Sequence, residues 1–397
     1  MQTPSDSVPA AMTHADQILL RENLRSEAQR LGFARLGIAP AQPPHRQEVF
    51  RHWLDQGFAG VMEKWLRRQE PLRADPATVL ENAQSVIMLV THYSTEPCSP
   101  TLAVSHKLDA AAGMPADECG ETKASLVDRG RVSRYAWGDD YHDLLRTRVN
   151  SLGAWLRAAV PGCRTRGVVD SSPLAEREFG WQAGLGWFGK NTMLIDPSAG
   201  SFFFLTALLT DLVLPADQPL EVDHCGTCTA CLDACPTGAL PAPRVLDANR
   251  CISAITIEDH GPVPLDLRRG MGEWIFGCDI CQEVCPWNRH APVSEEPTFS
   301  PRDGERTLSL VELLALDEVG FRQRFKGSPL LRAKRRGLLR SAAIAIGNSA
   351  HSGQPLTAAV ARALEAATND PEAVVRDAAA WALGQWREGK TQSLDSG

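Results

Sequence analysis

Cysteines carry the clearest chemical pattern in this sequence, because eight of the eleven lie between Cys225 and Cys285. The run CGTCTACLDACP has the CxxCxxCxxxCP spacing that is typical of proteins with two 4Fe-4S clusters. In such a run, three closely spaced thiolates bind one cluster, and the fourth cysteine, which precedes a proline, binds the other. The sequence therefore predicts two iron–sulfur centres that each carry one electron at a time.

A second run, CDICQEVCP, supplies three further cysteines ahead of a proline, and Cys251 between the runs completes the set. The crossover of the fourth cysteine predicts that each cluster draws thiolates from both runs. The first cluster is assigned Cys225, Cys228, Cys231 and Cys285, and the second is assigned Cys235, Cys251, Cys278 and Cys281. Zinc is the alternative metal, but a zinc site prefers two CxxC pairs, and eight thiolates with two CP ends match it poorly.

The three cysteines outside this stretch, Cys98, Cys119 and Cys163, have no partner at ligand spacing and are interpreted as packing thiols. The N-terminal segment has no basic stretch ahead of a continuous apolar run, so it does not resemble an export signal. No apolar run approaches the ~18 residues that span a bilayer. We therefore expect a soluble, cytoplasmic protein that makes no contact with a membrane.

The composition is that of an ordinary globular protein, with 43% hydrophobic and 22% charged residues. A formal net charge of −7 argues against binding nucleic acid over the whole surface, so any such contact must use a local patch. One candidate patch, the basic run, holds eight basic and no acidic residues: Arg322, Arg324, Lys326, Arg332, Lys334, Arg335, Arg336 and Arg340. Such a run suits RNA phosphates, although a basic helix that only faces water would show the same pattern.

The elements that must position these residues begin with alternating helices and strands ahead of the clusters. We expect helices at 16–33 and 141–160 and strands at 34–41, 85–91, 166–170 and 201–214. This alternation favours a mixed sheet flanked by helices. Residues 94–130, rich in Pro, Ser, Ala, Gly and Asp, predict a long mobile loop. The GLGWFG segment at 184–189 matches GxGxxG without a clear βαβ unit, so we interpret its glycines as points of close backbone approach rather than a dinucleotide site.

Residues 287–306 are interpreted as a polar linker, and the chain beyond them is expected to be helical. The segments SAAIAIGN (341–348) and AAAWALGQ (378–385) match at a shift of 37 residues, each with a glycine near an expected helix C-terminus. Asp370 and Pro371 suit the N-cap and the first position of the second helix. The pattern resembles HEAT-like repeats, with an ordinary helical hairpin as the alternative.

Longer segments are similar to the epoxyqueuosine reductase family. They are GRVSRYAWGDDYHDLL, VVDSSPLAEREFGWQAGLGWFGKNTMLI, the eight cysteines with RCIS at 250–253, and LLRAKRRGLLRSAAIAIGN, and the resemblance runs over nearly the whole chain. It implies a cobalamin-dependent oxidoreductase that reduces the epoxide of epoxyqueuosine to queuosine at the wobble position of tRNA. The implied partners are tRNA and an unidentified low-potential electron donor, and we expect a monomer.

The fold that this resemblance implies is α+β. It places a cobalamin-binding α/β domain at 1–220, a ferredoxin-like domain with both clusters at 221–290, and a HEAT-like, tRNA-contacting domain at 307–390. The loop at 94–130 is longer than the family pattern at that place. The DxHxxG signature, in which a histidine binds cobalt, is absent because Leu145 stands where glycine is needed after Asp140 and His142. We therefore expect no protein histidine on cobalt.

The resemblance also assigns roles to single residues. Asp170 in VVDSS would give a proton to the epoxide oxygen, and a partly buried carboxyl with a raised pKa suits that task. From the residues alone, Asp170 could equally cap the next helix. The positions that match cobalamin contacts of the family are Arg73, Ser133, Asp170, Ser253 and Asp279.

Other positions are assigned to the substrate. Arg177 matches a substrate-facing position, and within the basic run we assign Lys334, Arg335 and Arg336 to tRNA phosphates. Lys190 in FGKN is interpreted as a phosphate or amide contact, or as a solvated lysine. Two other functions stay open at this point: a reductive dehalogenase-like cobalamin enzyme and a ferredoxin-type electron carrier. Bound corrinoid would exclude the carrier.

Overall fold

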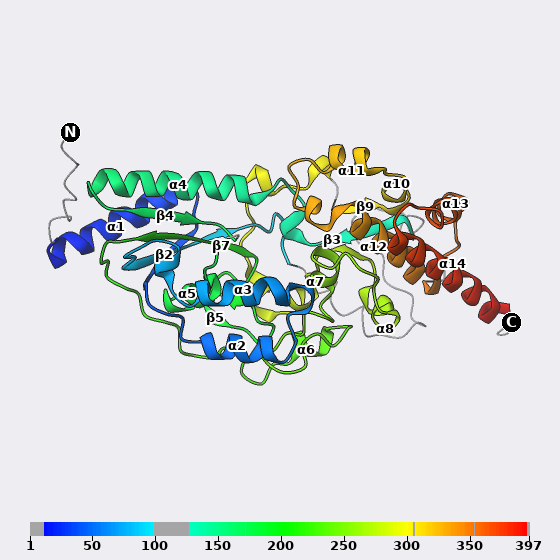
Figure 1. Cartoon of the computed structure of the whole chain (residues 1–397), viewed down its shortest axis with the longest axis horizontal. Helices are drawn as coiled ribbons and strands as arrows, with labels where there is room; N and C mark the ends of the chain where they lie inside the picture. Colours follow the sequence, from blue (N-terminus) through cyan, green and yellow to red (C-terminus); the bar gives the residue numbers. More distant parts are fainter. Residues whose placement is uncertain (1–11, 99–126, 171, 305, 353, 395–397) are drawn as a thin grey trace.

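A computed structural model describes residues 12–98, 127–170, 172–304, 306–352 and 354–394. The molecule is elongated, and its N-terminal and C-terminal regions lie at opposite ends (Figure 1). Cys119 and most of the predicted 94–130 loop fall outside the described residues. None of the described helices is long and apolar enough to cross a membrane.

The N-terminal region is built on a four-stranded sheet in the order β1-β2-β7-β4. The strands are β1 (Arg35–Pro40), β2 (Ser85–His92), β7 (Phe203–Thr210) and β4 (Thr165–Val168). All three neighbouring pairs are antiparallel, so the strand positions are confirmed but the prediction of a mixed sheet is wrong. Alternating helices and strands do not fix strand direction when long connections separate the neighbours.

Helices cover both faces of this sheet (Figure 1). They are α1 (His14–Arg30), α4 (Tyr141–Ala159) and α5 (Glu176–Gln182), with α2 (Gln47–Asp55) and α3 (Glu63–Arg73) further out. Leu24 of α1 and Leu152 of α4 pack in one core with Leu89, while Phe179 of α5 packs in the other with Met88. Because both faces are covered, the middle strands β2 and β7 are buried along nearly their whole length and are mostly apolar.

The GLGWFG segment enters a small antiparallel hairpin, β5 (Trp187–Phe188) with β6 (Leu194–Ile195). A Cβ atom on Gly186 would lie 2.4 Å from the carbonyl oxygen of Ile195. The interpretation of close backbone approach is therefore confirmed at this glycine.

A second sheet of three strands lies at the centre of the molecule in the order β8-β3-β9. The strands are β8 (Trp274–Phe276), β3 (Arg129–Val132) and β9 (Thr307–Ser309). Strand β3 pairs parallel with β8 and antiparallel with β9. It begins inside the predicted 94–130 loop, and its Val132 belongs to the core of the C-terminal helices. Four residues, RGRV, carry too little pattern to show this pairing in the sequence.

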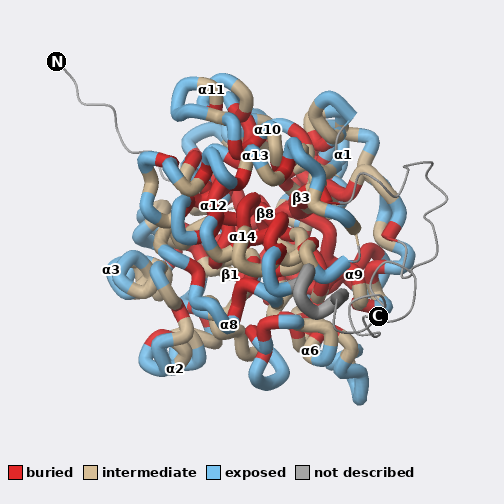
Figure 2. The backbone as a smooth tube through the Cα atoms, turned by 90° about the vertical axis from the view of Figure 1, so that its right-hand side faces the viewer, coloured by how far each residue is buried: buried red, intermediate tan, exposed pale blue. Residues whose placement is uncertain are grey.

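Short helices surround the cysteines, and longer ones form the C-terminal region. They are α6 (Ala230–Ala234), α7 (Ile252–Ile257), α8 (Leu265–Arg268), α9 (Ile280–Glu283), α10 (Leu310–Leu314), α11 (Glu318–Arg324), α12 (Lys334–Asn348), α13 (Ala358–Ala367) and α14 (Ala373–Leu394). Figure 2 shows buried residues on α12, β3 and β8, whereas α14, which lies at the C-terminal end in Figure 1, is buried along one face only.

The two matching C-terminal segments lie on packed helices, α12 and α14. A Cβ atom on Gly347 would meet the Trp381 ring at 2.5 Å, so glycine allows the two helices to approach closely. Asp370 accepts a hydrogen bond from the backbone N–H of Glu372 at 2.9 Å, but α14 begins at Ala373, so the prediction of Asp370 as N-cap and Pro371 as first helical position is two residues early. Gly384 lies inside α14, so the prediction that it marks a helix end is wrong.

Residues 287–306 are more than a polar linker. Asn288 is fully buried, and its side-chain oxygen accepts a hydrogen bond from the Ser201 backbone N–H at 2.6 Å. Phe299 packs edge-on against Phe204 of β7, with 5.5 Å between ring centroids. This segment therefore joins the two halves of the molecule, and the linker interpretation is corrected.

Candidate iron–sulfur and proton-transfer site

The four cysteines assigned to the first cluster lie together. Burial, and then the neighbouring thiols of Cys285, Cys225 and Cys228, raise the pKa of Cys231 to about 11. Cys228 is exposed, whereas Cys231 and Cys285 are buried. Trp187 and Trp287 pack against this set, with 5.0 Å between their ring centroids. The first set of thiols therefore lies close to the protein surface, with two tryptophan rings packed against it.

The four cysteines assigned to the second cluster also gather. Burial raises the pKa of Cys281 well above its ordinary value, and Cys251, Cys231 and Cys235 add to the shift. Burial likewise raises the pKa of Cys278, with Cys281 and Cys251 as neighbours. Since Cys231 belongs to the first set, the two sets adjoin.

The surroundings of the thiols suit cluster ligands. The backbone N–H of Ala239 donates to Cys235 Sγ at 3.3 Å, which stabilises a thiolate. Lys190 Nζ donates to the carbonyl oxygens of Gly226 and Cys228 at 2.6 and 2.9 Å, which confirms an amide contact for this lysine. Across the described parts of the chain, no three His, Cys, Asp or Glu side chains converge to hold one metal ion. The thiols of a four-iron cluster bind different irons and need not converge in this way.

Two of the three cysteines outside the cluster sets are confirmed as packing thiols. Cys98 Sγ lies 3.7 Å from the Glu283 carbonyl oxygen, and Cys163 Sγ lies 3.7 Å from that of Leu156. Both thiols are buried.

Ser133 and Asp279 are brought together on the side of the second thiol set. Both are buried; Ser133 Oγ donates to Asp279 Oδ1, and the Arg134 backbone N–H donates to Asp279 Oδ2 at 2.7 Å. Gly277 has a φ of 68°, and a Cβ there would lie 2.4 Å from Ser133 Cβ. Glycine is therefore required for Ser133 to reach Asp279. Ser253 lies two residues beyond Cys251, at the start of α7.

Asp170 follows β4, and its side chain is 64% exposed. Its φ of 54° is in the left-handed region, which a non-glycine residue rarely adopts without a local constraint. The Tyr141 hydroxyl donates to Asp170 Oδ2 at 3.0 Å, and His142 Nε2 lies 3.3 Å from the same oxygen. Both partners come from the first turn of α4, whose N-cap is Asp140.

The charge state of Asp170 differs from the expectation. Its hydrogen bond with His142, and then that with Tyr141, lowers its pKa instead of raising it. Burial lowers the pKa of His142, but hydrogen bonds to Asp140 and Asp170 outweigh burial and raise it to about 9. His142 Nδ1 lies 2.7 Å from Asp140 Oδ1. The proton of this site is therefore held on His142, between two carboxylates.

Further charged side chains surround Asp170. Burial raises the pKa of Glu176 to about 8, the charge of Asp170 adds to this shift, and Arg73 and Arg177 oppose it. Arg177 Nη1 donates to the Thr192 carbonyl oxygen at 2.6 Å. The structure thus brings Arg73 and Arg177 to the neighbourhood of Asp170. Sequence reasoning considered His142 only as a possible cobalt ligand and did not predict that Tyr141, His142 or Glu176 would lie near Asp170, although all three lie in the segments that carry the family resemblance.

The basic run divides into buried and accessible parts. Arg335 is buried, and its guanidinium forms two hydrogen bonds with Asp370, one of 3.1 Å. Arg340 is fully buried, and its guanidinium donates to the Gly261 and Ile255 carbonyl oxygens. Arg335 therefore cannot offer its charge to a phosphate in this structure, and its assignment to tRNA is corrected. Lys334 is exposed and Arg336 is half-buried.

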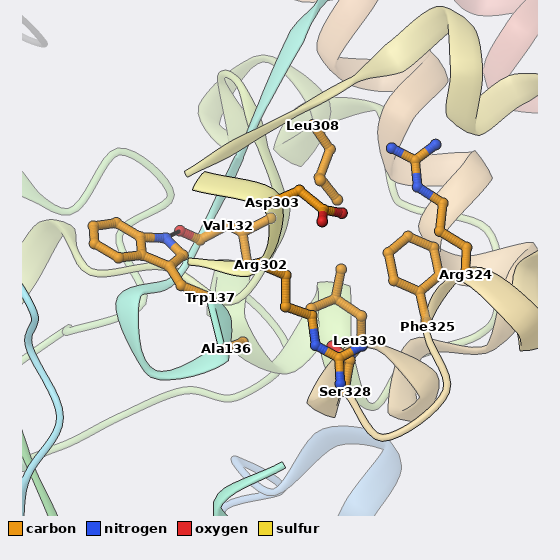
Figure 3. Close-up of a pocket in the computed structure, with 10 residues that line it drawn as sticks. All are labelled: Val132, Ala136, Trp137, Arg302, Asp303, Leu308, Arg324, Phe325, Ser328 and Leu330. Atoms are coloured by element: carbon orange, nitrogen blue, oxygen red, sulfur yellow. Dashed lines mark hydrogen bonds between the residues drawn. The ribbon is translucent and has the colours of Figure 1, made fainter. Parts of the chain in front are cut away.

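A small cavity of about 70 Å³ lies where the segment ahead of α4 meets the C-terminal region (Figure 3). Trp137 borders it on one side and Phe325 on the other, with Arg302 between them. Arg302 Nη2 donates to the Gly327 carbonyl oxygen at 2.6 Å, and the Asp140 backbone N–H donates to the same oxygen at 2.8 Å. The start of α4, which presents His142 to Asp170, is thereby fixed to the C-terminal region.

Two adjoining sets of four thiols beside a hydrogen-bonded carboxylate define an iron–sulfur oxidoreductase. Residues 224–288 match the model of the 4Fe-4S double cluster binding domain, and residues 73–171 match that of epoxyqueuosine reductase QueG, DUF1730. The chain is 37% identical to the epoxyqueuosine reductase of Pseudomonas aeruginosa over 95% of this chain and 96% of the relative. The chain belongs to the epoxyqueuosine reductase family.

Solved structures agree with this placement. One is an epoxyqueuosine reductase bound to an epoxyqueuosine-modified tRNA-Tyr stem loop, with a TM-score of 0.78, 27% identity and coverage of 96% of this chain and 95% of that one. Another is the Bacillus subtilis enzyme with its catalytic aspartate loop swung out of the active site, with a TM-score of 0.79, 28% identity and the same coverage. Family membership decides against the dehalogenase and the simple electron carrier.

Proposed function

We propose that this chain reduces the epoxide of epoxyqueuosine in tRNA to queuosine, with Asp170 delivering a proton to the oxygen that leaves. The observation that supports this most strongly is the placement of Asp170, hydrogen-bonded to Tyr141 and His142, in a chain whose eight cysteines form two adjoining sets. The reaction takes up two electrons and two protons, breaks both C–O bonds of the epoxide, and releases the oxygen as water.

The proton path follows from the charge states. Asp170 is ionised, so it can protonate a developing oxyanion only after it has received a proton. His142 carries that proton, with Nε2 3.3 Å from Asp170 Oδ2. Burial raises the pKa of Tyr141, so its hydroxyl stays protonated and orients the Asp170 carboxylate. Asp170 is thus the donor at the substrate, and His142 is its proton reserve.

Cobalamin is the proposed cofactor at the carbon centre, and Arg73, Ser133, Ser253 and Asp279 are the proposed contacts, with Asp170 nearby. Tyr135 supports a common space for them: burial raises its pKa, and both Asp279 and Asp170 add to the shift, so Tyr135 adjoins the Ser133–Asp279 pair and Asp170. When bound, the clusters supply electrons singly and cobalamin supplies a strongly nucleophilic reduced cobalt. Ser133 and Asp279 already bind each other, so they would offer it a prearranged polar surface.

Residues 1–220 are proposed to bind cobalamin and to carry the catalytic site, and residues 221–290 are proposed to hold the clusters. Residues 307–390 are proposed to contact tRNA and to pack as HEAT-like repeats. Strand β3 belongs to the first unit by its sequence position, but its partner strands β8 and β9 lie in the other two units. The three units therefore share one central sheet. Lys334 and Arg336 are the proposed phosphate contacts within the basic run, and Arg177, near Asp170, is the proposed substrate-facing residue. The electron donor is proposed to be a separate low-potential carrier, and the chain a monomer.

The test is a single-turnover assay. Clusters are reconstituted without oxygen, cobalamin and a chemical reductant are added, and the modified base of epoxyqueuosine-containing tRNA is measured by mass spectrometry. Loss of one oxygen atom is expected. An unchanged base, despite full iron content and bound corrinoid, would contradict the proposal.

A further inference from the structure

The turn between β5 and β6 contacts both cysteine runs. Lys190 Nζ donates to the carbonyl oxygens of Gly226 and Cys228 at 2.6 and 2.9 Å, within the first run. The side-chain N–H of Asn191 donates to the carbonyl oxygen of Cys281 at 3.2 Å, within the second run. Adjacent side chains of one turn therefore reach the two thiol sets, and the first set receives a cation where the second receives a neutral amide.

The backbone around Lys190 is held in place. Its carbonyl oxygen accepts a hydrogen bond from the Arg244 backbone N–H at 2.9 Å, and Arg244 Nε donates to the Phe188 carbonyl oxygen at 3.0 Å. On the other side, Asn191 is buried, and its side-chain oxygen accepts a hydrogen bond from the Met193 backbone N–H at 3.2 Å. The ammonium group of Lys190 is therefore directed at the first cysteine run from a fixed turn.

The positive charge of Lys190 is not cancelled by an ion pair. In the part of the chain that the structure describes, no carboxylate forms a salt bridge with its ammonium group. Asp223, just ahead of the first run, pairs instead with Arg244 Nη2 at 2.6 Å. Lys190 is half-buried, so water and salt screen its charge less than that of a lysine on an open surface. Its charge therefore acts on the loop that carries Cys228.

A nearby charge changes how readily an iron–sulfur cluster is reduced. Reduction gives the cluster one more negative charge, so a fixed cation stabilises the reduced form and raises the reduction potential. Asn191, which contacts the second run, carries no charge, and that run itself holds a carboxyl side chain, Asp279, between Cys278 and Cys281. The side chains around the two thiol sets therefore favour an electron on the first set over one on the second.

We propose that Lys190 raises the reduction potential of the first cluster, so that an electron donor reduces this cluster ahead of the second. The donor, a one-electron carrier of low potential, loses one electron and the first cluster gains it, with no bond made or broken. Cys228 is exposed, so the first set lies where such a donor can approach. The proposal rests on the thiol assignment within the proposed function and not on the epoxide step.

The test is a redox titration of the full chain with both clusters reconstituted and no tRNA present, followed by electron paramagnetic resonance. Lys190→Gln keeps a hydrogen-bond donor but removes the charge, and we expect it to lower the higher of the two midpoint potentials and to leave the lower one nearly unchanged. The ratio of reduced to oxidised first cluster at a fixed potential should fall about 3- to 10-fold, where tenfold corresponds to ~59 mV for one electron. Lys190→Arg keeps the charge and should keep the higher midpoint.

Two further variants control this result. Lys326→Gln removes an exposed lysine that follows α11 and should move neither midpoint. Cys228→Ser replaces a thiolate ligand by an oxygen ligand and should alter the resonance signal that appears at the higher midpoint, which identifies it as the first cluster.

Several outcomes would overturn the proposal. They are unchanged midpoints in Lys190→Gln, equal shifts of both midpoints, and an equal fall in Lys190→Arg, which would show that charge is not the cause. Loss of iron in Lys190→Gln would also overturn it, because Lys190 would then build the loop rather than set its potential. An inactive wild-type enzyme in the single-turnover assay would instead count against the proposed function and would leave these midpoints unaffected.

Discussion

The thiol sets and the Asp170 site are built in different ways. The thiols come from short loops, and backbone groups such as the Ala239 N–H support them locally. Asp170 is 64% exposed and is surrounded by side chains from α4 and α5, and the charge of Arg332 in the 3₁₀ helix η11 (Pro329–Ala333) also acts on it. Most ligands of each thiol set therefore follow from the spacing within two short cysteine runs, whereas the carboxylate site depends on how separate helices and strands are assembled. Changes at one should leave the other intact.

Loss of a buried cluster ligand tests this independence most severely. Cys281→Ala is expected to abolish turnover and to remove about half of the iron, because the second cluster needs all four thiolates. Iron content and reductase activity measure the effect. Cys163→Ala, which removes a buried thiol outside both sets, should keep the iron and the activity. Full iron content in the Cys281 variant would show that the second set is assigned wrongly.

The opposite variant removes the proton donor. Asp170→Ala is expected to keep both clusters and bound corrinoid but to lower turnover by roughly 10²- to 10⁴-fold, the usual contribution of a positioned acid. The measurement is the single-turnover rate, with the visible spectrum as the control for the cofactors. Asp143→Ala, an 85% exposed carboxylate on the same helix as His142, should be nearly silent. Full activity without Asp170 would refute its role.

Arg335 and Arg336 are adjacent in the sequence, but we expect the first to support folding and the second to bind tRNA. Arg335→Ala leaves Asp370 buried without its partner and should cost about 3–5 kcal/mol in the free energy of unfolding. Arg336→Ala should cost less than about 1 kcal/mol but weaken tRNA binding and flatten its salt dependence. Denaturant unfolding and stem-loop titration measure the two quantities. The reverse pattern would return Arg335 to the tRNA surface.

The last expected effect concerns the pH dependence of stability. The pKa of His142 is raised from 6.5 to about 9, so its stabilising contribution is complete below pH 6.5 and is lost as the pH rises through about 9. The free-energy difference between wild type and His142→Asn should therefore shrink by on the order of 3 kcal/mol over this range. Urea unfolding at both ends of the range measures it. A difference that is independent of pH would mean that His142 is neutral in the folded protein.

Features that depend on a short stretch of sequence could be predicted, whereas features that depend on tertiary contacts could not. The spacing of Cys225, Cys228 and Cys231 is itself the chemical signal, and the apolar run from Ser85 predicts β2 directly. The partners of Asp170 could not be found in this way, because their meeting depends on how α4 and η11 are placed. Arg335 shows the same limit: one row of basic residues can face both a core carboxylate and water.

Strand β3 has a consequence for how the chain is made. Its Arg131 pairs with Trp274 on one side and with Thr307 on the other, both far later in the sequence. Such distant pairing is slow, and during synthesis the central sheet cannot close until the C-terminal region has left the ribosome. The cysteine loops emerge before that moment. Because β8 leads directly into Cys278, the second thiol set reaches its final arrangement only when this sheet has closed.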